Sequence, residues 1–352
     1  MKLTTGLLYG KFSHPYGHFF NQRNINIRKT TIKKLPFYKK DKLKVLELGG
    51  TGQDAIAFAQ LGFDTTFIDL SKINTQKTKN FAEINKLKLN IINGDFLKHD
   101  FNEKYDIIRS RGVIHHINRP EKVFLKINKL LKEGGYLHFN LYRSGTFYYW
   151  FVENLRNFSK KISFKNFNEI LSSIKLKKKE NNLMGNKTIK ALSDFKCIII
   201  DDLYVPTLIP ANYFKVRKFL INNNFDIVKE NILRKEIDHN IRYPDFPLKN
   251  EHIVFDCKKN TKKKVSNSRL SLDNKSEISL TKKDQLINKN NNSFRELIKL
   301  MNKKKLFNNK YFIKEIISLY KNCYLLSVKR GSKLSRHKSL NKRLINFYNN
   351  FK

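Results

Sequence analysis

Residues 45–70 read VLELGGTGQDAIAFAQLGFDTTFIDL and carry the strongest structural signal in the chain. The stretch begins as a short apolar strand, turns through Gly49, Gly50 and Gly52, continues as an apolar helix and ends as a second strand. A strand, a helix and a second strand in this order predict a right-handed parallel crossover. The glycines stand where the backbone must turn sharply and approach a ligand without intervening Cβ atoms.

The same alternation of β-rich runs and helical segments continues to Tyr142. Further strands are expected at LNIINGDF (89–96), YDIIRSRGV (105–113) and YLHFNLY (136–142), with helices beginning near Ser71 and at Pro120. The second of these helices has Pro120 in its first turn, an apolar face that includes Leu131, and Gly134 as its expected C-terminal stop. The alternation predicts a parallel sheet covered by helices.

Two closing strands are expected after a helix near residues 211–221. They are NFDIVKENI (224–232) and EHIVFDC (251–257). Neighbouring strands with a short connection are typically antiparallel, so this end of the sheet should differ from the rest.

An adenosine site is indicated by the glycine turn together with Asp69, which ends the second strand and can accept hydrogen bonds from both ribose hydroxyls. The segment from Gly50 to Ala55 also fits the GxGxxG/A pattern of dinucleotide-binding folds, which keeps a dehydrogenase open. Glu47 argues against it, because a carboxylate just before the glycines suits an ammonium group and repels a pyrophosphate.

Four motifs in order, VLELGGTGQDAIAFAQLGFDTTFIDLS, NGDF, YDIIRSRGVIHHI and LLKEGGYLHFNLY, resemble those of class I S-adenosylmethionine-dependent methyltransferases. The resemblance covers residues 42–142 and, in outline, the closing strands to Lys259. GVIHHI followed by EGGYLHFNLY resembles a bacterial branch of small-molecule methyltransferases. The family implies an α/β, Rossmann-like, doubly wound and mostly parallel seven-stranded sheet with an antiparallel last strand, and S-adenosyl-L-methionine as cofactor.

The resemblance also implies which residues bind the cofactor. Glu47 faces its amino group, Gly49, Gly50 and Gly52 lie along its methionine part, Asp69 binds the ribose, Leu70 packs on the adenine, Asp95 accepts the exocyclic amine, Phe96 flanks the ring and Arg111 lies near the methionine portion. Each of three residues also has a purely structural explanation: Leu70 can be part of the core, Asp95 can cap a turn and Arg111 can be a solvent-facing loop residue. After Glu47, the glycine turn is one residue shorter than the family's usual E/D-x-G-x-G-x-G.

Methyl transfer requires no covalent nucleophile, but an oxygen or nitrogen acceptor often needs a base. His115 or His116 is the candidate, and simple packing or hydrogen bonding in the strand-end turn is the alternative for each. A lid over the acceptor is a further hypothesis for His14, Tyr16 and His18, or for the aromatic residues of GTFYYWF (145–151). No metal site is expected, because the histidines have no cysteine or carboxylate at ligand spacing.

The net charge of +41 reflects 71 basic and 30 acidic residues, and the last 95 residues hold 26 basic and 5 acidic ones. A lysine- and asparagine-rich composition explains this charge without nucleic acid, although RNA binding by the tail stays open. We expect six segments: an N-terminal helical or lid segment (1–41), the cofactor-binding part of the core (42–142), a substrate-binding insert (143–210), the end of the core (211–259), a flexible linker (260–292) and a basic helical tail (293–352).

A cytoplasmic enzyme is expected, because the three cysteines are widely spaced and no apolar run approaches the roughly 20 residues of a membrane span. The leading hypothesis is methyl transfer to an oxygen, nitrogen or carbon of a small molecule or biosynthetic intermediate. The alternatives are an RNA methyltransferase that uses the basic tail, or a noncatalytic methyltransferase-like binding protein with a degenerate glycine turn.

Overall fold

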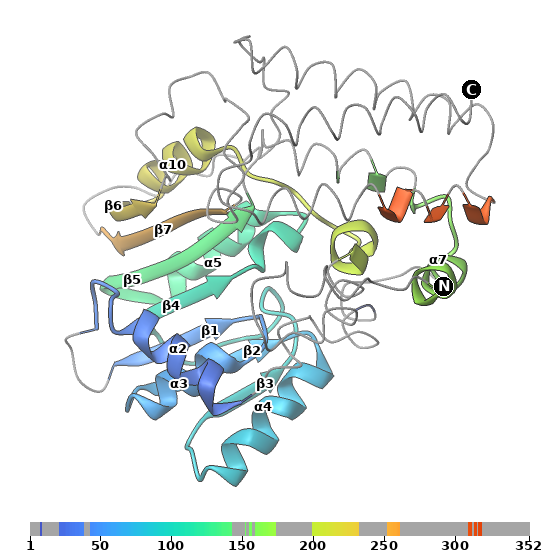
Figure 1. Cartoon of the computed structure of the whole chain (residues 1–352). Coiled ribbons are helices and arrows are strands. Elements are labelled where there is room, and N and C mark those ends of the chain that lie inside the picture. Colours follow the sequence, from blue (N-terminus) through green and yellow to red (C-terminus); the bar gives the residue numbers. More distant parts are fainter. Residues whose placement is uncertain are drawn as a thin grey trace, which may run out of the picture. The chain divides into compact units, whose positions relative to one another are not determined.

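The computed structural model describes residues 8, 21–38, 43–142, 152, 155–156, 159–173, 199–231, 252–260, 309–311, 313–314 and 316–318. The chain divides into two compact units. One comprises residues 1–142, 205–232 and 252–273, and the other comprises residues 143–204, 233–251 and 274–352. The first unit contains a seven-stranded sheet (Figure 1).

The strands are β1 (Lys44–Leu48), β2 (Asp64–Asp69), β3 (Asn90–Asn93), β4 (Tyr105–Arg111), β5 (Leu131–Tyr142), β6 (Phe225–Asn231) and β7 (His252–Lys259). Their order in the sheet is β3-β2-β1-β4-β5-β7-β6. Strands β1 to β5 pair in parallel, whereas β7 is antiparallel to both β5 and β6. The predicted seven-stranded, mostly parallel sheet with an antiparallel last strand is confirmed.

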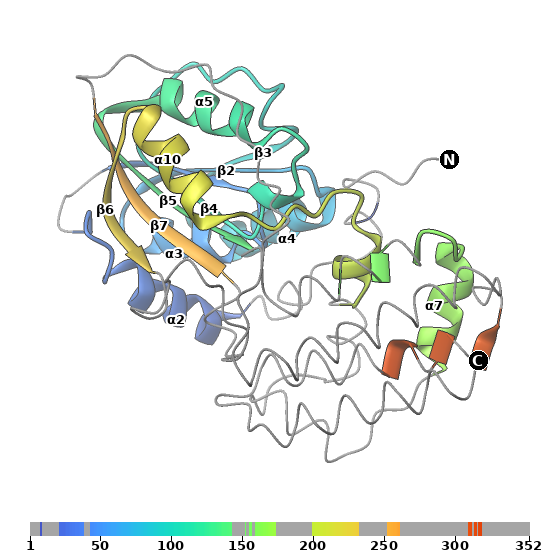
Figure 2. The same ribbon diagram turned by 90° about the horizontal axis from the view of Figure 1, so that it is seen from above.

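Helices cover both faces of this sheet, as Figure 2 shows. They are α2 (Gln22–Ile32), α3 (Gln53–Gln60), α4 (Lys72–Ile84), α5 (Pro120–Leu130), α10 (Tyr213–Asn222) and the short 3₁₀ helix η2 (Ile114–His116). Helices α2, α3 and α4 pack on one face, and α5 and α10 pack on the other. The parallel strands are therefore buried on both faces, which explains their nearly continuous apolar runs.

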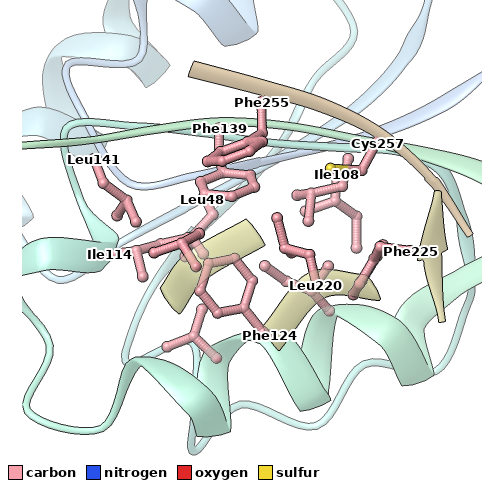
Figure 3. Close-up of a cluster of buried hydrophobic side chains, with 14 of the residues drawn as sticks. Leu48, Ile108, Ile114, Phe124, Phe139, Leu141, Leu220, Phe225, Phe255 and Cys257 are labelled. Atoms are coloured by element: carbon pink, nitrogen blue, oxygen red, sulfur yellow. The ribbon is translucent and has the colours of Figure 1, made fainter. Parts of the chain in front are cut away.

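The larger apolar core lies between the sheet and helices α5 and α10 (Figure 3). Phe139 of β5 stacks on Phe255 of β7 with ring centroids 5.4 Å apart, and Phe124 of α5 meets Phe139 edge-on at 4.9 Å. Because side chains alternate along a strand, Leu46 faces this core while Val45 faces the smaller core under α2 and α3.

The expected end of helix α5 at Gly134 is wrong. The helix ends at Leu130, and Leu131 is already extended, fully buried and paired with Tyr105 of β4. Gly134 does adopt a positive φ of 67°, but it lies inside β5, close to a shift in the β4–β5 register. Burial and strand pairing of Leu131 outweigh the helical pattern to which it contributes.

The second unit contains helix α7 (Phe164–Ser172), whose Phe167, Ile170 and Leu171 are buried. Near the C-terminus, the described residues between 310 and 318 are helical, and Ile313 and Ile317 are buried there. The remaining residues of the predicted basic tail lie outside the described part of the chain. Among the helices that are described, none is long and apolar enough to cross a membrane.

Candidate cofactor and active site

The carboxyl ends of β1 and β4 form the point where the strand order reverses. The chain passes from β1 to β2 on one side, and β4 lies on the other side of β1. In open α/β sheets, ligands bind at such a reversal, in the crevice beyond the carboxyl ends of the strands. The glycine turn follows β1, Leu70 follows β2 and η2 follows β4, so the predicted site residues gather around this edge.

The glycine turn has a backbone that only glycine adopts easily. Gly49, Gly50 and Gly52 have φ angles of 69°, 90° and 76°, in the left-handed region. A Cβ atom on Gly49 would lie 2.7 Å from Val113, and one on Gly52 would lie 1.9 Å from Oγ1 of Thr78. Close packing of Val113 and Thr78 therefore requires glycine at positions 49 and 52, whereas the space beside Gly50 is open.

Asp69 ends β2 beside this turn. One carboxylate oxygen accepts a 2.7 Å hydrogen bond from the backbone N–H of Ser71. Burial raises the pKa of Asp69 to about 7, although hydrogen bonds from Ser71, Asn74 and Gly50 act in the opposite direction. Asn74 also donates a 3.0 Å bond to the carbonyl of Gly50, so one α4 side chain connects the predicted ribose ligand with the glycine turn.

The predicted adenine contacts differ from one another in exposure. Leu70 is 48% exposed, which is unusual for a leucine next to a buried strand and leaves an apolar surface at the sheet edge. Asp95 accepts a 2.8 Å hydrogen bond from the N–H of Leu97 and so caps the turn after β3. Phe96 is only 3% exposed and packs 5.7 Å from the ring of Phe101. Their roles toward adenine stay predictions.

Five charged side chains, Arg28, Glu47, Asp54, Arg109 and Arg111, form a charge cluster beside the glycine turn, in which Glu47 and Arg109 are buried and the other three are partly exposed. Nη1 of Arg109 lies 2.8 Å from Oδ1 of Asp54 and 3.8 Å from Oε2 of Glu47. Arg111 and Arg28 approach Asp54 to 3.6 and 3.8 Å. Three guanidinium groups from two elements thus converge on one carboxylate in the first turn of α3.

The two carboxylates of the charge cluster have opposite pKa shifts. Burial raises the pKa of Glu47 to about 8, and Arg109 only partly offsets this effect. Burial also disfavours the ionised form of Asp54, but Arg109, Arg28 and Arg111 hold its pKa below the usual range. Burial lowers the pKa of Arg111 to about 10. The three guanidinium groups therefore favour the ionised form of Asp54, whereas burial favours the neutral form of Glu47.

Asp54 and Arg109 were not among the predicted site residues. A signal for Arg109 is present in the sequence, because YDIIRSR places an arginine in the middle of a strand that is buried on both faces, where arginine is almost never found unpaired. The same reasoning applies to His138 of β5 and Asp256 of β7, which form a buried 2.5 Å contact. The partner of each of these buried polar residues is set by the register between adjacent strands, which the sequence alone does not reveal.

The two candidate histidines lie in η2 and have different surroundings. His115 is fully buried, its ring stacks on Tyr142 at 3.7 Å, and its Nδ1 accepts a 3.3 Å hydrogen bond from the N–H of Tyr142. Nδ1 of His116 lies 2.9 Å from the carbonyl oxygen of Thr207, to which it can only donate. In the neutral state, His115 therefore carries its proton on Nε2, and His116 carries its proton on Nδ1.

The proposed lid residues His14, Tyr16 and His18 and the stretch 145–151 lie outside the described residues. Within the described part of the chain, no group of three or more His, Cys, Asp or Glu side chains is arranged to hold a metal ion.

Residues at the carboxyl ends of β1 and β2 could bind a ligand that combines a nucleoside with an amino acid. Oε2 of Glu47 is buried, lies 3.8 Å from Arg109 and accepts no hydrogen bond from any described residue, so it can accept one from an ammonium group. The glycine turn with open space beside Gly50, the carboxylate of Asp69 and the exposed side chain of Leu70 follow along the same edge. These residues fit the cofactor that the resemblance implies.

Residues 19–170 match a protein-family model described as a methyltransferase domain. Residues 19–170 therefore carry a methyltransferase domain, and the strand order agrees with the class I S-adenosylmethionine-dependent fold that the motifs imply.

Among curated proteins, the chain is similar to the ubiquinone biosynthesis O-methyltransferases of Pelagibacter ubique and Rickettsia akari. The first match is 31% identical over 133 residues, 36% of this chain and 54% of that protein. The second is 28% identical over 95 residues, 27% of this chain and 38% of that protein. The chain thus spans about half the length of these relatives or less.

Among solved structures, magnesium protoporphyrin IX methyltransferase from Synechocystis with bound SAH is similar in fold. The identity is 14% and the TM-score is 0.42, and the similarity covers 70% of this chain and 84% of that chain.

Proposed function

We propose that the protein transfers a methyl group from S-adenosyl-L-methionine to an oxygen, nitrogen or carbon atom of a small-molecule or biosynthetic-intermediate acceptor. The observation that carries this proposal is the glycine turn with positive φ angles and open space at Gly50, beside Asp69 at the strand-order reversal. The matched methyltransferase domain over residues 19–170 supports it. The cofactor supplies a methyl group activated by a sulfonium.

The chain's own residues would bind and orient this cofactor. The glycine turn lets the backbone approach the methionine portion. Burial favours the neutral form of Glu47 in the free site, and the cofactor's ammonium group would favour its carboxylate. Ionised Asp69 accepts hydrogen bonds from the ribose hydroxyls, and Leu70 covers one face of the adenine. Alignment of the reacting atoms and exclusion of water then account for most of the catalysis.

We assign the base to His116 and a supporting role to His115. The hydrogen bond from Nδ1 of His116 to Thr207 sets the neutral tautomer in which Nε2 is the basic nitrogen, as a general base for an acceptor's proton requires. His115 presents its lone pair to the backbone N–H of Tyr142 instead. The stack of His115 on Tyr142 holds η2 against the end of β5, and so positions its neighbour.

Among the three possible acceptor atoms, the curated relatives favour oxygen, because they are named as O-methyltransferases. Their matches cover at most about a third of this chain. We therefore take from them the reaction type and leave the acceptor to residues 143–210, the proposed substrate-binding insert.

The direct test is calorimetric titration of the full chain with S-adenosylmethionine, followed by a metabolite screen for acceptor-dependent release of S-adenosylhomocysteine. We expect binding in the wild type and a loss of about tenfold or more in Asp69→Ala, because a charged hydrogen-bond partner disappears. Asp64→Ala is the matched control, since Asp64 is exposed at the opposite end of the same strand. Well-folded wild type that binds no cofactor would refute the proposal.

A further inference from the structure

The glycine turn is held to the rest of the domain at three points. At its start, the N–H of Gly49 donates a 2.8 Å hydrogen bond to the carbonyl of Ile68 on β2. In its middle, Asn74 donates to the carbonyl of Gly50 at 3.0 Å. At its end, Gly52 precedes α3 and provides no side-chain cap, while core packing of α3 and one further polar contact hold the start of that helix.

That contact is the ion pair between Asp54, in the first turn of α3, and Arg109 of β4. The carboxylate is 2.8 Å from Nη1 of a guanidinium that is fully buried and lies 5.5 Å above the ring of Phe58. Arg109 also stands directly opposite Glu47 in the β1–β4 register. One guanidinium therefore connects the start of α3 with both strands that flank the strand-order reversal.

We propose that Asp54 and Arg109 are positioning residues, which tie the exit of the shortened glycine turn to the sheet and hold it in its cofactor-binding conformation. This inference rests on the proposed function. A turn with three glycines at positive φ has an unusually large conformational freedom to lose, and each residue left free to move weakens a ligand that needs it ordered. With one residue fewer than its family's pattern, the turn depends more strongly on where its two ends are held.

Stability alone gives no reason for a charged pair at this place. Replacing a buried ion pair by apolar residues of similar volume is often neutral or even stabilising, whereas breaking it on one side is costly. The same sheet provides a comparison, because Lys132 and Asp106 form an ion pair of the same 2.8 Å length at the amino ends of β5 and β4, at the opposite end of the strands from the glycine turn.

The test compares three variants of the full chain with the wild type: Asp54→Asn, the apolar double variant Asp54→Leu with Arg109→Met, and the control double variant Asp106→Asn with Lys132→Gln. Calorimetry measures the dissociation constant of S-adenosylhomocysteine. Amide hydrogen exchange of residues 50–56 is measured in the free protein, and thermal unfolding is followed in parallel.

We expect Asp54→Asn and the apolar double variant to bind S-adenosylhomocysteine about tenfold more weakly or worse, and to exchange these amides about tenfold faster, because freeing about one backbone residue has that effect. The control should lower the unfolding temperature and leave affinity and exchange at this turn unchanged. The apolar pair keeps the test valid if Asp54→Asn does not fold.

The proposal is overturned if the apolar double variant folds and retains wild-type affinity and exchange, or if the control weakens binding as much. If the wild type binds no S-adenosylhomocysteine, the proposed function fails, while the exchange of residues 50–56 in the free protein still reports whether Asp54 and Arg109 hold the turn.

Discussion

Gly52→Ala should destabilise the fold far more than Gly50→Ala, although both glycines have positive φ angles of 76° and 90°. Each substitution forces alanine into the left-handed region, at a cost of about 1–2 kcal/mol. At Gly50 the nearest atom to the new Cβ is 3.8 Å away, so little more is lost. At Gly52 the Cβ would lie 1.9 Å from Oγ1 of Thr78, which adds about 1–3 kcal/mol of overpacking.

The difference between the two variants is the quantity to measure, because the lower unfolded-state entropy of alanine affects both equally and cancels. Urea unfolding followed by circular dichroism gives each free energy of unfolding. Thr78→Ala in the Gly52→Ala background should recover part of the loss, since it removes Oγ1 and Cγ2 from the clash. The steric reasoning is refuted if Gly52→Ala is as stable as Gly50→Ala to within about 0.5 kcal/mol, or if Thr78→Ala recovers nothing.

Three further predictions follow from individual side chains. The pKa of Glu47 is raised to about 8 in the folded protein, so the folded state binds more protons than the unfolded state between about pH 5 and pH 8. The free energy of unfolding should therefore fall as pH rises through this window. Urea titrations at several pH values should show a flatter dependence on pH in Glu47→Gln than in the wild type, and an equal dependence would contradict the prediction. Leu70→Ser should leave stability within about 0.5 kcal/mol, because Leu70 is half exposed, yet weaken cofactor binding by about tenfold in calorimetry. His116→Gln should lower kcat by about 10²-fold or more with unchanged cofactor affinity, while His115→Ala should mainly destabilise the fold, by on the order of 2–4 kcal/mol in urea unfolding. Equal kinetic effects of both histidine variants at equal stability would reverse the assignment.

The sheet could be predicted from the sequence because its signals are local. Each strand is a short apolar run, and turn residues such as Gly49 and Pro120 separate it from the next helix. The end of α5 could not be read in this way. Leu131 continues the apolar face of that helix in the sequence, and only its pairing with Tyr105 of β4 makes it a strand residue.

The part of the candidate site that lies in the turns after the strands could be predicted from the sequence. The charge cluster was not, because Asp54 and Arg109 meet only through the packing of α3 on the β1–β4 pair. The two histidines were equivalent in the sequence for the same reason. Their difference comes from Thr207, 91 residues away, and from the backbone of Tyr142.

The row of polar residues across the middle of the sheet also constrains how the strands can pair. Glu47, Arg109, His138 and Asp256 stand opposite one another on four adjacent strands. Because side chains alternate between faces, a slip of one residue in β4 would carry Arg109 from this row into the apolar layer under α5. The charged residues of this row thus also disfavour a shifted strand register. The register that lets the sheet fold is therefore the same one that forms the ligand site.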